Sequence, residues 1–135
     1  MNDLYGQIVS EIDRAIERHS REAIELSDHL ARNPEISGQE FESSKKHVEL
    51  LSRYGFEVKY PFLDIPTAFC ARKSNGKGAR VALLVEYDAL PEIGHACGHC
   101  LHGAMSTLAA IGLASVFDKL KGELLVIGTP AEETN

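Results

Sequence analysis

The chain has 135 residues, of which 44% are hydrophobic and 25% charged, and its formal net charge at pH 7 is -6. This length and composition predict one soluble globular domain, and the acidic balance excludes a basic surface for nucleic acid or anionic membranes. No apolar run approaches the roughly 20 residues that span a bilayer and no secretory signal opens the sequence, so we expect a cytoplasmic protein. Three cysteines are too few for a disulfide framework.

The first part of the chain predicts two helices. Residues 33–34, Asn-Pro, end the first one, because proline disfavours the helical conformation at the residue before it. Residues 37–40, Ser-Gly-Gln-Glu, have the spacing of a capping box and predict the start of a second helix. Gly55 is placed to end that helix. The first helix is predicted from a stripe of apolar residues at helical spacing: Leu4, Ile8, Ile12, Ile16, Ala23, Leu26 and Leu30.

The middle and the end of the chain predict strands around one more helix. Residues 56–60 and 67–71 have strand patterns, and residues 74–78, Ser-Asn-Gly-Lys-Gly, predict a hairpin-like turn. Residues 80–85 are almost wholly apolar, which predicts a central strand with helices on both faces of the sheet. A buried helix from about residue 99 and a strand over residues 123–128 follow. This order predicts an α/β fold with a sheet between helical layers.

Metal-type ligands follow two of the predicted strands. Asp88, Cys97 and His99 come after the apolar strand, and Glu132 and Glu133 come directly after the last one. Cysteine, histidine and carboxylate are the ligands of zinc sites. If these two strands run parallel, both groups emerge at the same edge of the sheet. The sequence therefore predicts that the five side chains converge on one crevice.

Other residues of this stretch leave alternatives open. Cys97 to Cys100 reads Cys-Gly-His-Cys, the Cys-x-x-Cys pattern of a thioredoxin-like oxidoreductase, although no tryptophan precedes it and redox chemistry gives the two glutamates no use. A non-catalytic zinc-binding module is a third reading. His102 lies one helical turn after His99 on the same face and could be a further ligand, although a residue that supports a ligand or a surface histidine is the favoured reading. His95 could orient a ligand or bind substrate.

Three ordered motifs carry a resemblance to a known family. They are residues 86–91 (Glu-Tyr-Asp-Ala-Leu-Pro), 94–99 (Gly-His-Ala-Cys-Gly-His) and 128–133 (Gly-Thr-Pro-Ala-Glu-Glu), and residues 32–40 add a fourth similar segment. The chain resembles the zinc-dependent aminoacylase and amidohydrolase metallopeptidases. Within them it is most similar to the aminobenzoyl-glutamate hydrolase and β-alanyl-lysine dipeptidase branch, which is related to the indoleacetyl-amino-acid and hippurate hydrolases. The resemblance implies a three-layer α/β/α zinc-peptidase-like sheet.

The resemblance also implies a role for each residue of the site. Cys97, His99 and Glu133 match metal ligands, Glu132 matches the general base and Asp88 matches the acid that supports the site. The implied cofactor is a divalent metal, with zinc expected and manganese or cobalt as alternatives. It would activate water for hydrolysis of an amide bond in a small N-acyl amino acid or dipeptide.

The chain also departs from the family in two respects. Cys100 stands where the family usually has Asn or Asp, which is the first departure. Glu86 lies at a position that varies within the family, so no role is assigned to it. The second departure is chain length. The family's chains are much longer and carry further ligands and a second, lid or dimerisation domain. The resemblance thus implies that residues 1–135 are the N-terminal part of an incomplete catalytic domain, which by itself should bind metal poorly and lack amidase activity. Homodimers would belong to the full-length form.

Overall fold

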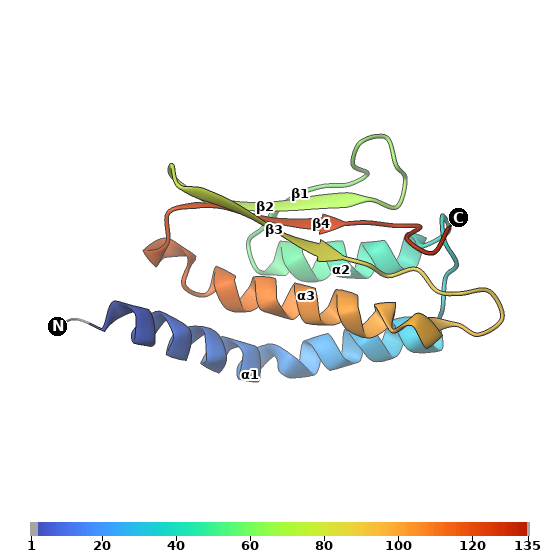
Figure 1. The fold of residues 1–135 in the computed structure, drawn as a ribbon, viewed down its shortest axis with the longest axis horizontal. Coiled ribbons are helices and arrows are strands. Elements are labelled where there is room, and N and C mark those ends of the chain that lie inside the picture. The colour runs from blue at the N-terminus through green and yellow to red at the C-terminus, as the bar shows by residue number, and fades with distance from the viewer. Residues whose placement is uncertain (1–2, 135) are drawn as a thin grey trace.

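The computed structural model describes residues 3–134, which form three α-helices and a four-stranded mixed sheet (Figure 1). Two single-turn 3₁₀ helices, η1 and η2, lie on either side of α3. Within the described residues, no helix is both long and apolar enough to cross a membrane. In chain order the elements are α1 (Leu4–Arg32), α2 (Phe41–Arg53), β1 (Glu57–Lys59), β2 (Phe69–Asn75), β3 (Ala79–Val85), η1 (His95–Cys97), α3 (His99–Ala114), η2 (Phe117–Lys119) and β4 (Gly122–Gly128).

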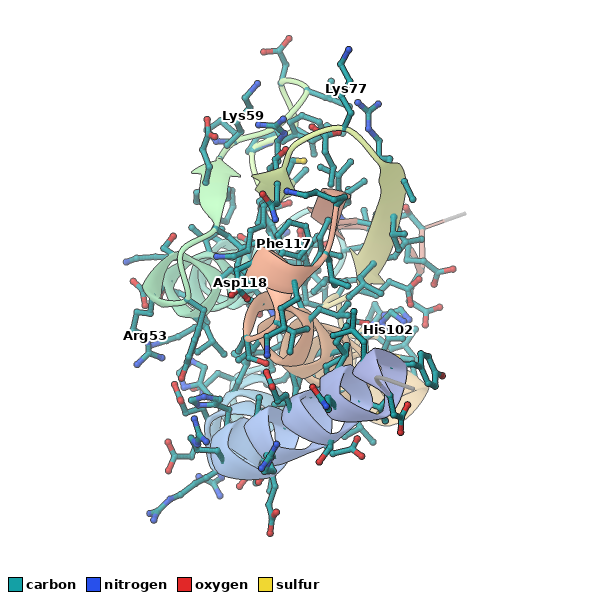
Figure 2. All side chains as sticks on the ribbon, turned by 90° about the vertical axis from the view of Figure 1, so that its left-hand side faces the viewer. Arg53, Lys59, Lys77, His102, Phe117 and Asp118 are labelled. Carbon is teal, nitrogen blue, oxygen red and sulfur yellow. The ribbon has the colours of Figure 1, made fainter. Side chains whose placement is uncertain are left out.

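The helices of residues 3–134 cover one face of the sheet. In Figures 1 and 2, α2 and α3 lie next to the strands and α1 lies beyond α3, farthest from the sheet. The core between sheet and helices is built around large buried side chains such as Phe69, Tyr87, Leu30 and Leu51. The expected helical layer on the other face is not formed by these residues, and that face carries Arg72 and Arg80, both paired with Glu123 of β4.

The strand over residues 80–85 is not central, which corrects the prediction from its apolar sequence. The strand order is β1-β2-β4-β3, so β3 lies at an edge and β4 lies inside the sheet. Val81 and Leu84 of β3 are 51% and 50% exposed. An apolar run indicates a strand whose faces are covered by other elements, but it does not specify which strands pair with it.

The turn at residues 74–78 does not close a hairpin, because β2 and β3 do not pair with each other. Both pair with β4, which is antiparallel to β2 and parallel to β3. Gly122 is opposite Asn75 on one side and Ala79 on the other. Its φ is +129°, and a Cβ there would lie 2.0 Å from the Ala79 carbonyl oxygen. Glycine therefore permits β4 to enter between the two strands.

The predicted capping box at residues 37–40 is also wrong. Helix α2 begins at Phe41, and the Glu35 carboxylate accepts hydrogen bonds from the amides of Glu42 and Ser43 at 3.1 and 2.7 Å. Ser37 instead donates to Asp88 from its hydroxyl group at 2.7 Å. Local spacing suggested a local cap, whereas Ser37 bonds to Asp88, and Glu40 accepts from Thr67 and Ala131 as well as from the nearby Gly38 amide. The first helix ends at Arg32, as predicted.

Candidate metal centre

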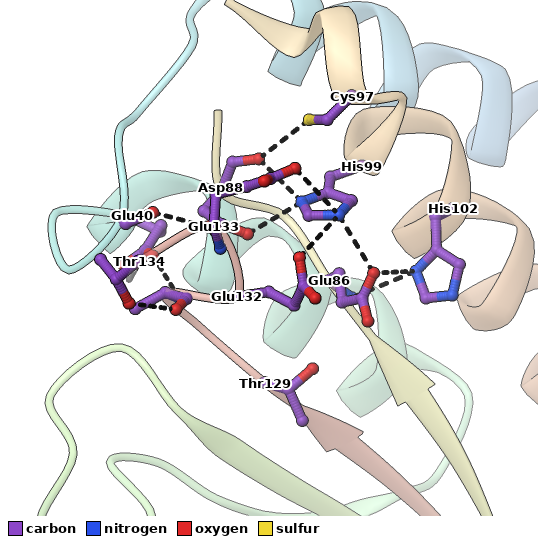
Figure 3. Close-up of polar contacts among 12 residues, drawn as sticks. Glu40, Glu86, Asp88, Cys97, His99, His102, Thr129, Glu132, Glu133 and Thr134 are labelled. Carbon is purple, nitrogen blue, oxygen red and sulfur yellow. Dashed lines mark hydrogen bonds and ion pairs between the residues drawn. The ribbon is translucent and has the colours of Figure 1, made fainter. Parts of the chain in front are cut away.

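The candidate site lies where β3 and β4 end side by side (Figure 3). The two strands are parallel, with Val85 opposite Gly128, and the Thr129 amide continues the ladder by donating to the Val85 carbonyl oxygen at 2.9 Å. The residues that follow each strand therefore emerge at one edge of the sheet. The structure brings Asp88 together with Cys97, His99, Glu132 and Glu133 there, and this convergence agrees with the sequence prediction.

The loop between β3 and α3 turns back so that its end approaches its beginning. Leu90 and Gly94 form an antiparallel bridge, and η1 follows directly. Gly98 joins η1 to α3 with φ at +88°, a left-handed conformation that glycine adopts without steric cost. Because nothing lies within 4 Å of a Cβ built at Gly98, the backbone conformation and not the available space calls for glycine. This turn places His99 in the first turn of α3.

Asp88 fixes the orientation of the His99 ring. His99 is buried, and its Nδ1 lies 2.9 Å from Oδ1 of the fully buried Asp88. An Nδ1–H group that donates to this carboxylate leaves Nε2 with a free lone pair. Nε2 faces three carboxylates, at 3.1 Å from Glu86, 3.6 Å from Glu132 and 3.8 Å from Glu133. An imidazole held in this way presents a metal-binding nitrogen to a ring of acidic oxygens.

Asp88 itself is held in its ionised form. Burial opposes its charge, but hydrogen bonds from the Glu133 amide, the Ser37 hydroxyl and His99 outweigh burial and lower the pKa of Asp88. The Glu133 amide and the Ser37 hydroxyl both donate to Oδ2, at 2.9 and 2.7 Å. Asp88 therefore connects the loop after β3, the loop after β4 and the segment before α2.

Two groups of side chains have the chemistry and spacing of metal ligands. The ligand atoms of Cys97, His99 and Glu133 all lie within 4.8 Å of one another, and so do those of Glu86, His99 and Glu132. Thiolate, imidazole and carboxylate fit zinc, and imidazole with two carboxylates fits a divalent ion with more oxygen ligands. Both groups use His99, whose single free Nε2 binds one ion at a time. The donor set of these residues therefore fits a divalent metal.

Known proteins with similar sequences include a dipeptidase and a subunit of an aminobenzoyl-glutamate hydrolase. No protein-family profile matches the chain. It is 35% identical over 138 residues to the Xaa-Arg dipeptidase of Mus musculus, covering 90% of this chain and 30% of that protein. It is 33% identical over 141 residues to one of the subunits of the p-aminobenzoyl-glutamate hydrolase of Escherichia coli, with 90% and 29% covered.

The fold also matches a crystal structure described as a dinuclear metal-binding peptidase of the M20 family, from Bacillus subtilis. The TM-score is 0.76 at 31% identity, over 90% of this chain and 37% of that one. The chain belongs to the M20 family of peptidases and amidohydrolases. It spans about 30% of the length of these two curated relatives.

His95 and His102, whose roles the sequence did not decide, have different surroundings. His102 lies on α3 beside Glu86, with its Nδ1 3.4 Å from the Glu86 amide and 3.6 Å from the Glu86 carboxylate (Figure 3). It therefore contacts Glu86 and neither Cys97 nor Glu133. Neither ring nitrogen of His95 hydrogen-bonds another described residue. Burial, with the nearby His99, lowers the pKa of His95, so its ring stays neutral at neutral pH.

The two cysteines of the Cys-x-x-Cys sequence do not have the environment of a redox pair. Burial raises the pKa of Cys97, whereas reactive thiols of such motifs have a lowered pKa. The Cys97 thiol contacts the Asp88 carbonyl oxygen at 3.7 Å, while Cys100 packs against the hydrophobic core. All three cysteines of the described residues are free. These features disfavour thiol exchange by this pair.

Sequence reasoning missed two acidic residues of the candidate site. Glu86 received no role, yet it lies closer to Nε2 of His99 than any other carboxylate. A signal was present, because residues two apart in an extended segment point to the same side, as Glu86 and Asp88 do. Glu40 was assigned to a helix cap and instead accepts a hydrogen bond from the Ala131 amide. No sequence pattern indicated that contact, which joins segments 91 residues apart.

Proposed function

We propose that this chain forms part of the catalytic domain of a metal-dependent amidohydrolase that cleaves an amide bond in a small N-acyl amino acid or dipeptide. One observation carries the proposal: the ligand atoms of Cys97, His99 and Glu133 lie within 4.8 Å of one another at the edge where β3 and β4 end. The names of the relatives, a dipeptidase and an aminobenzoyl-glutamate hydrolase, support the substrate class.

In this proposal Cys97, His99 and Glu133 hold the metal, with zinc expected and manganese or cobalt as alternatives. A bound divalent ion supplies a Lewis acid for the amide carbonyl and lowers the pKa of a bound water to about 7. Glu132 is the general base. Its side chain is 51% exposed, and one carboxylate oxygen lies 3.6 Å from Nε2 of His99. It can therefore meet both solvent and substrate, take a proton from water and return it to the leaving amine.

Asp88 serves as the acid that orients His99 in this mechanism. It does not face the substrate, because its side chain is fully buried and its two oxygens already accept from His99, Ser37 and Glu133. Its hydrogen bond to Nδ1 fixes the tautomer and the orientation of the imidazole that would bind the ion. The substrate would enter from the open side of the site, where Glu132 lies.

We further propose that the complete catalytic domain is a three-layer α/β/α sheet of which residues 1–135 supply the N-terminal part. The uncovered face of the sheet and Leu84 of β3, which lies on that face and is 50% exposed, support this arrangement, because apolar sheet faces are normally covered. The lid or dimerisation domain, and any homodimer, would belong to the remaining part of a longer chain. Each ligand group here supplies only three donors, so we expect weak metal binding and no efficient turnover.

Zinc titration of the purified chain tests the proposal. Wild-type protein should bind zinc, and Cys97→Ser or His99→Gln should weaken binding strongly, because each removes one of three donors. Cys100→Ser is the matched control and should bind as wild type does. Equal losses in Cys97→Ser and Cys100→Ser would instead indicate a zinc module based on the Cys-x-x-Cys sequence.

The role of Glu132 is tested by the same titration and by an activity assay. Glu132→Gln should keep the zinc affinity of wild type, since a general base is not a ligand. Any hydrolysis of dipeptides or N-acetyl amino acids by the zinc-loaded chain should disappear in this variant. Loss of zinc binding in Glu132→Gln would make Glu132 a ligand, in the group with Glu86 and His99.

A further inference from the structure

Glu40 is a fully buried carboxylate at the N-terminus of α2. It accepts three hydrogen bonds from three separate segments: from the Gly38 amide at 2.8 Å, from the Thr67 hydroxyl at 3.0 Å and from the Ala131 amide at 2.8 Å. Among residues 3–134 it forms no ion pair with a Lys, Arg or His side chain. A buried charge is costly unless it is hydrogen-bonded, so these three donors define the position of Glu40.

The contact with Ala131 has a consequence for the candidate site. Ala131 has a φ of +58°, a left-handed conformation that residues other than glycine rarely adopt and that the surroundings must hold. It directly precedes Glu132 and Glu133. Its conformation therefore sets the direction in which the chain presents both carboxylates, and the bond from its amide to Glu40 holds that conformation.

The segment is fixed on its other side by Asp88, which accepts from the Glu133 amide at 2.9 Å. Glu132 lies between Ala131 and Glu133 in the sequence, and Figure 3 shows Glu40, Asp88 and Glu132 around the loop after β4. Ser37, three residues before Glu40, donates to the same oxygen of Asp88. The segment before α2 thus reaches the loop after β3 through Ser37 and the loop after β4 through Glu40.

We propose that Glu40 is a positioning residue of the metal centre: through the Ala131 amide it fixes Glu132 and Glu133 relative to Asp88 and His99. It touches neither the ion nor the substrate. The proposal rests on the proposed function for its effect on metal binding, whereas its structural part, control of the loop at Ala131, does not need a metal.

Three variants of the full chain test this role. Glu40→Ala removes all three acceptor contacts. Glu35→Ala is the matched control, because the Glu35 carboxylate also accepts two backbone amides, those of Glu42 and Ser43, and these lie in α2. Glu40→Gln is the rescue variant, since its carbonyl oxygen can still accept from Gly38 and Ala131 while the Thr67 hydroxyl accepts from its amide group.

Two readouts are needed: hydrogen exchange of the Ala131 amide by NMR in the metal-free chain, and the zinc dissociation constant. Glu40→Ala should speed exchange at Ala131 and raise the dissociation constant about 10- to 100-fold, the usual effect of losing a residue that supports a ligand. Glu40→Gln should restore both values toward wild type. Glu35→Ala should lower the midpoint of urea unfolding but change neither value.

The outcomes separate this inference from the proposed function. If wild-type protein binds no zinc, the proposed function fails, and exchange at Ala131 still decides whether Glu40 controls the loop. If Glu40→Ala leaves Ala131 exchange unchanged, or if Glu35→Ala raises the zinc dissociation constant as much, the inference is overturned. Should Glu40→Ala fail to fold, Glu40→Asp takes its place, because its shorter side chain draws the carboxylate back from Ala131.

Discussion

Asp88 shows how one buried side chain can join several segments of the candidate site. Its two oxygens receive His99, Ser37 and the Glu133 amide, which come from three different segments. The Ser37 hydroxyl and the Glu133 amide would lose this acceptor if the carboxylate were lost, whereas Nδ1 of His99 would keep the Asp88 carbonyl oxygen at 3.1 Å. An unpaired buried donor costs about 1–3 kcal/mol. The same residue therefore contributes to stability and to the presentation of ligands.

Asp88→Asn should reduce both properties. The variant keeps the shape of the side chain but replaces one acceptor oxygen with a donor, so at least one of the three groups loses its partner. We expect a loss of about 1–3 kcal/mol in the free energy of unfolding, measured in urea, and a zinc affinity lower by about 10- to 100-fold. Asp118→Asn, at an exposed position of η2, is the control and should change neither quantity.

At the scale of elements, the site depends on how closely α3 approaches the end of β3. Gly103 permits that approach: a Cβ at this position would lie 2.5 Å from the Glu86 carbonyl oxygen and 3.0 Å from Nε2 of His47. Both neighbours are fixed, the first because it is backbone and the second because His47 is fully buried. The absence of a side chain at Gly103 thus determines the distance between the helix that carries His99 and the strand that leads to Glu86.

Gly103→Ala should therefore destabilise the protein, although alanine is favoured over glycine inside a helix by about 1 kcal/mol. Overpacking against fixed atoms typically costs about 1–3 kcal/mol, and it should outweigh the gain in helix propensity. Gly112→Ala in the same helix is the comparison, since a Cβ there meets side-chain atoms of Ile16 and Ile12, which can change rotamer. Thermal unfolding should show the larger loss for Gly103→Ala, and the opposite order would contradict this account of the packing.

For the whole molecule, His47 couples stability to pH. Burial lowers the pKa of His47 from 6.5 to about 3, and the ring is held neutral with Nδ1 2.9 Å from the Thr107 hydroxyl oxygen. Between these two pKa values the unfolded chain binds a proton that the folded chain does not. Protons therefore favour unfolding, so the stability present above pH 6.5 is lost as the pH falls toward 3, by at most about 1.4 kcal/mol per pH unit from this residue.

The measurement is urea unfolding of wild type and His47→Gln between pH 7 and pH 4. The variant should be less stable at pH 7, because it disturbs a packed interior, and its stability should fall less steeply with acid. Asp88, whose pKa is lowered, adds a second loss at lower pH in both proteins. Parallel pH profiles of wild type and variant would show that His47 is not the group responsible.

Features of the fold that depend on residues close together in the sequence could be predicted, whereas features that depend on distant segments could not. Helix α1 was predicted because a stripe at helical spacing and Asn33-Pro34 are local features. The meeting of Asp88 with Glu132 and Glu133 was predicted because it needs only two parallel strands. Strand order, by contrast, depends on which chain segment enters between which others, and β3 was misplaced for that reason.

Within the candidate site, residues close together in the sequence were easier to recognise than contacts between distant loops. Cys97 and His99 are two apart and could be recognised as a pair. Glu40 and Ala131 are 91 residues apart in the sequence. Glu40 was therefore interpreted from its neighbours in the sequence alone and was assigned to a helix cap. Glu86 was not recognised because its position relative to His99 depends on the turn at Gly98 and on the close packing at Gly103.

The position of β4 between β2 and β3 also constrains the order in which the chain can fold. During synthesis, residues 79–85 leave the ribosome before residues 122–128, and within the described sheet β4 is the sole strand partner of β3. The parallel pair can form only after some 40 further residues have been added, and such distant pairings are slow to form. Until then the apolar β3 has no strand beside it. Nascent chains at this stage are the ones most exposed to aggregation and to chaperone binding.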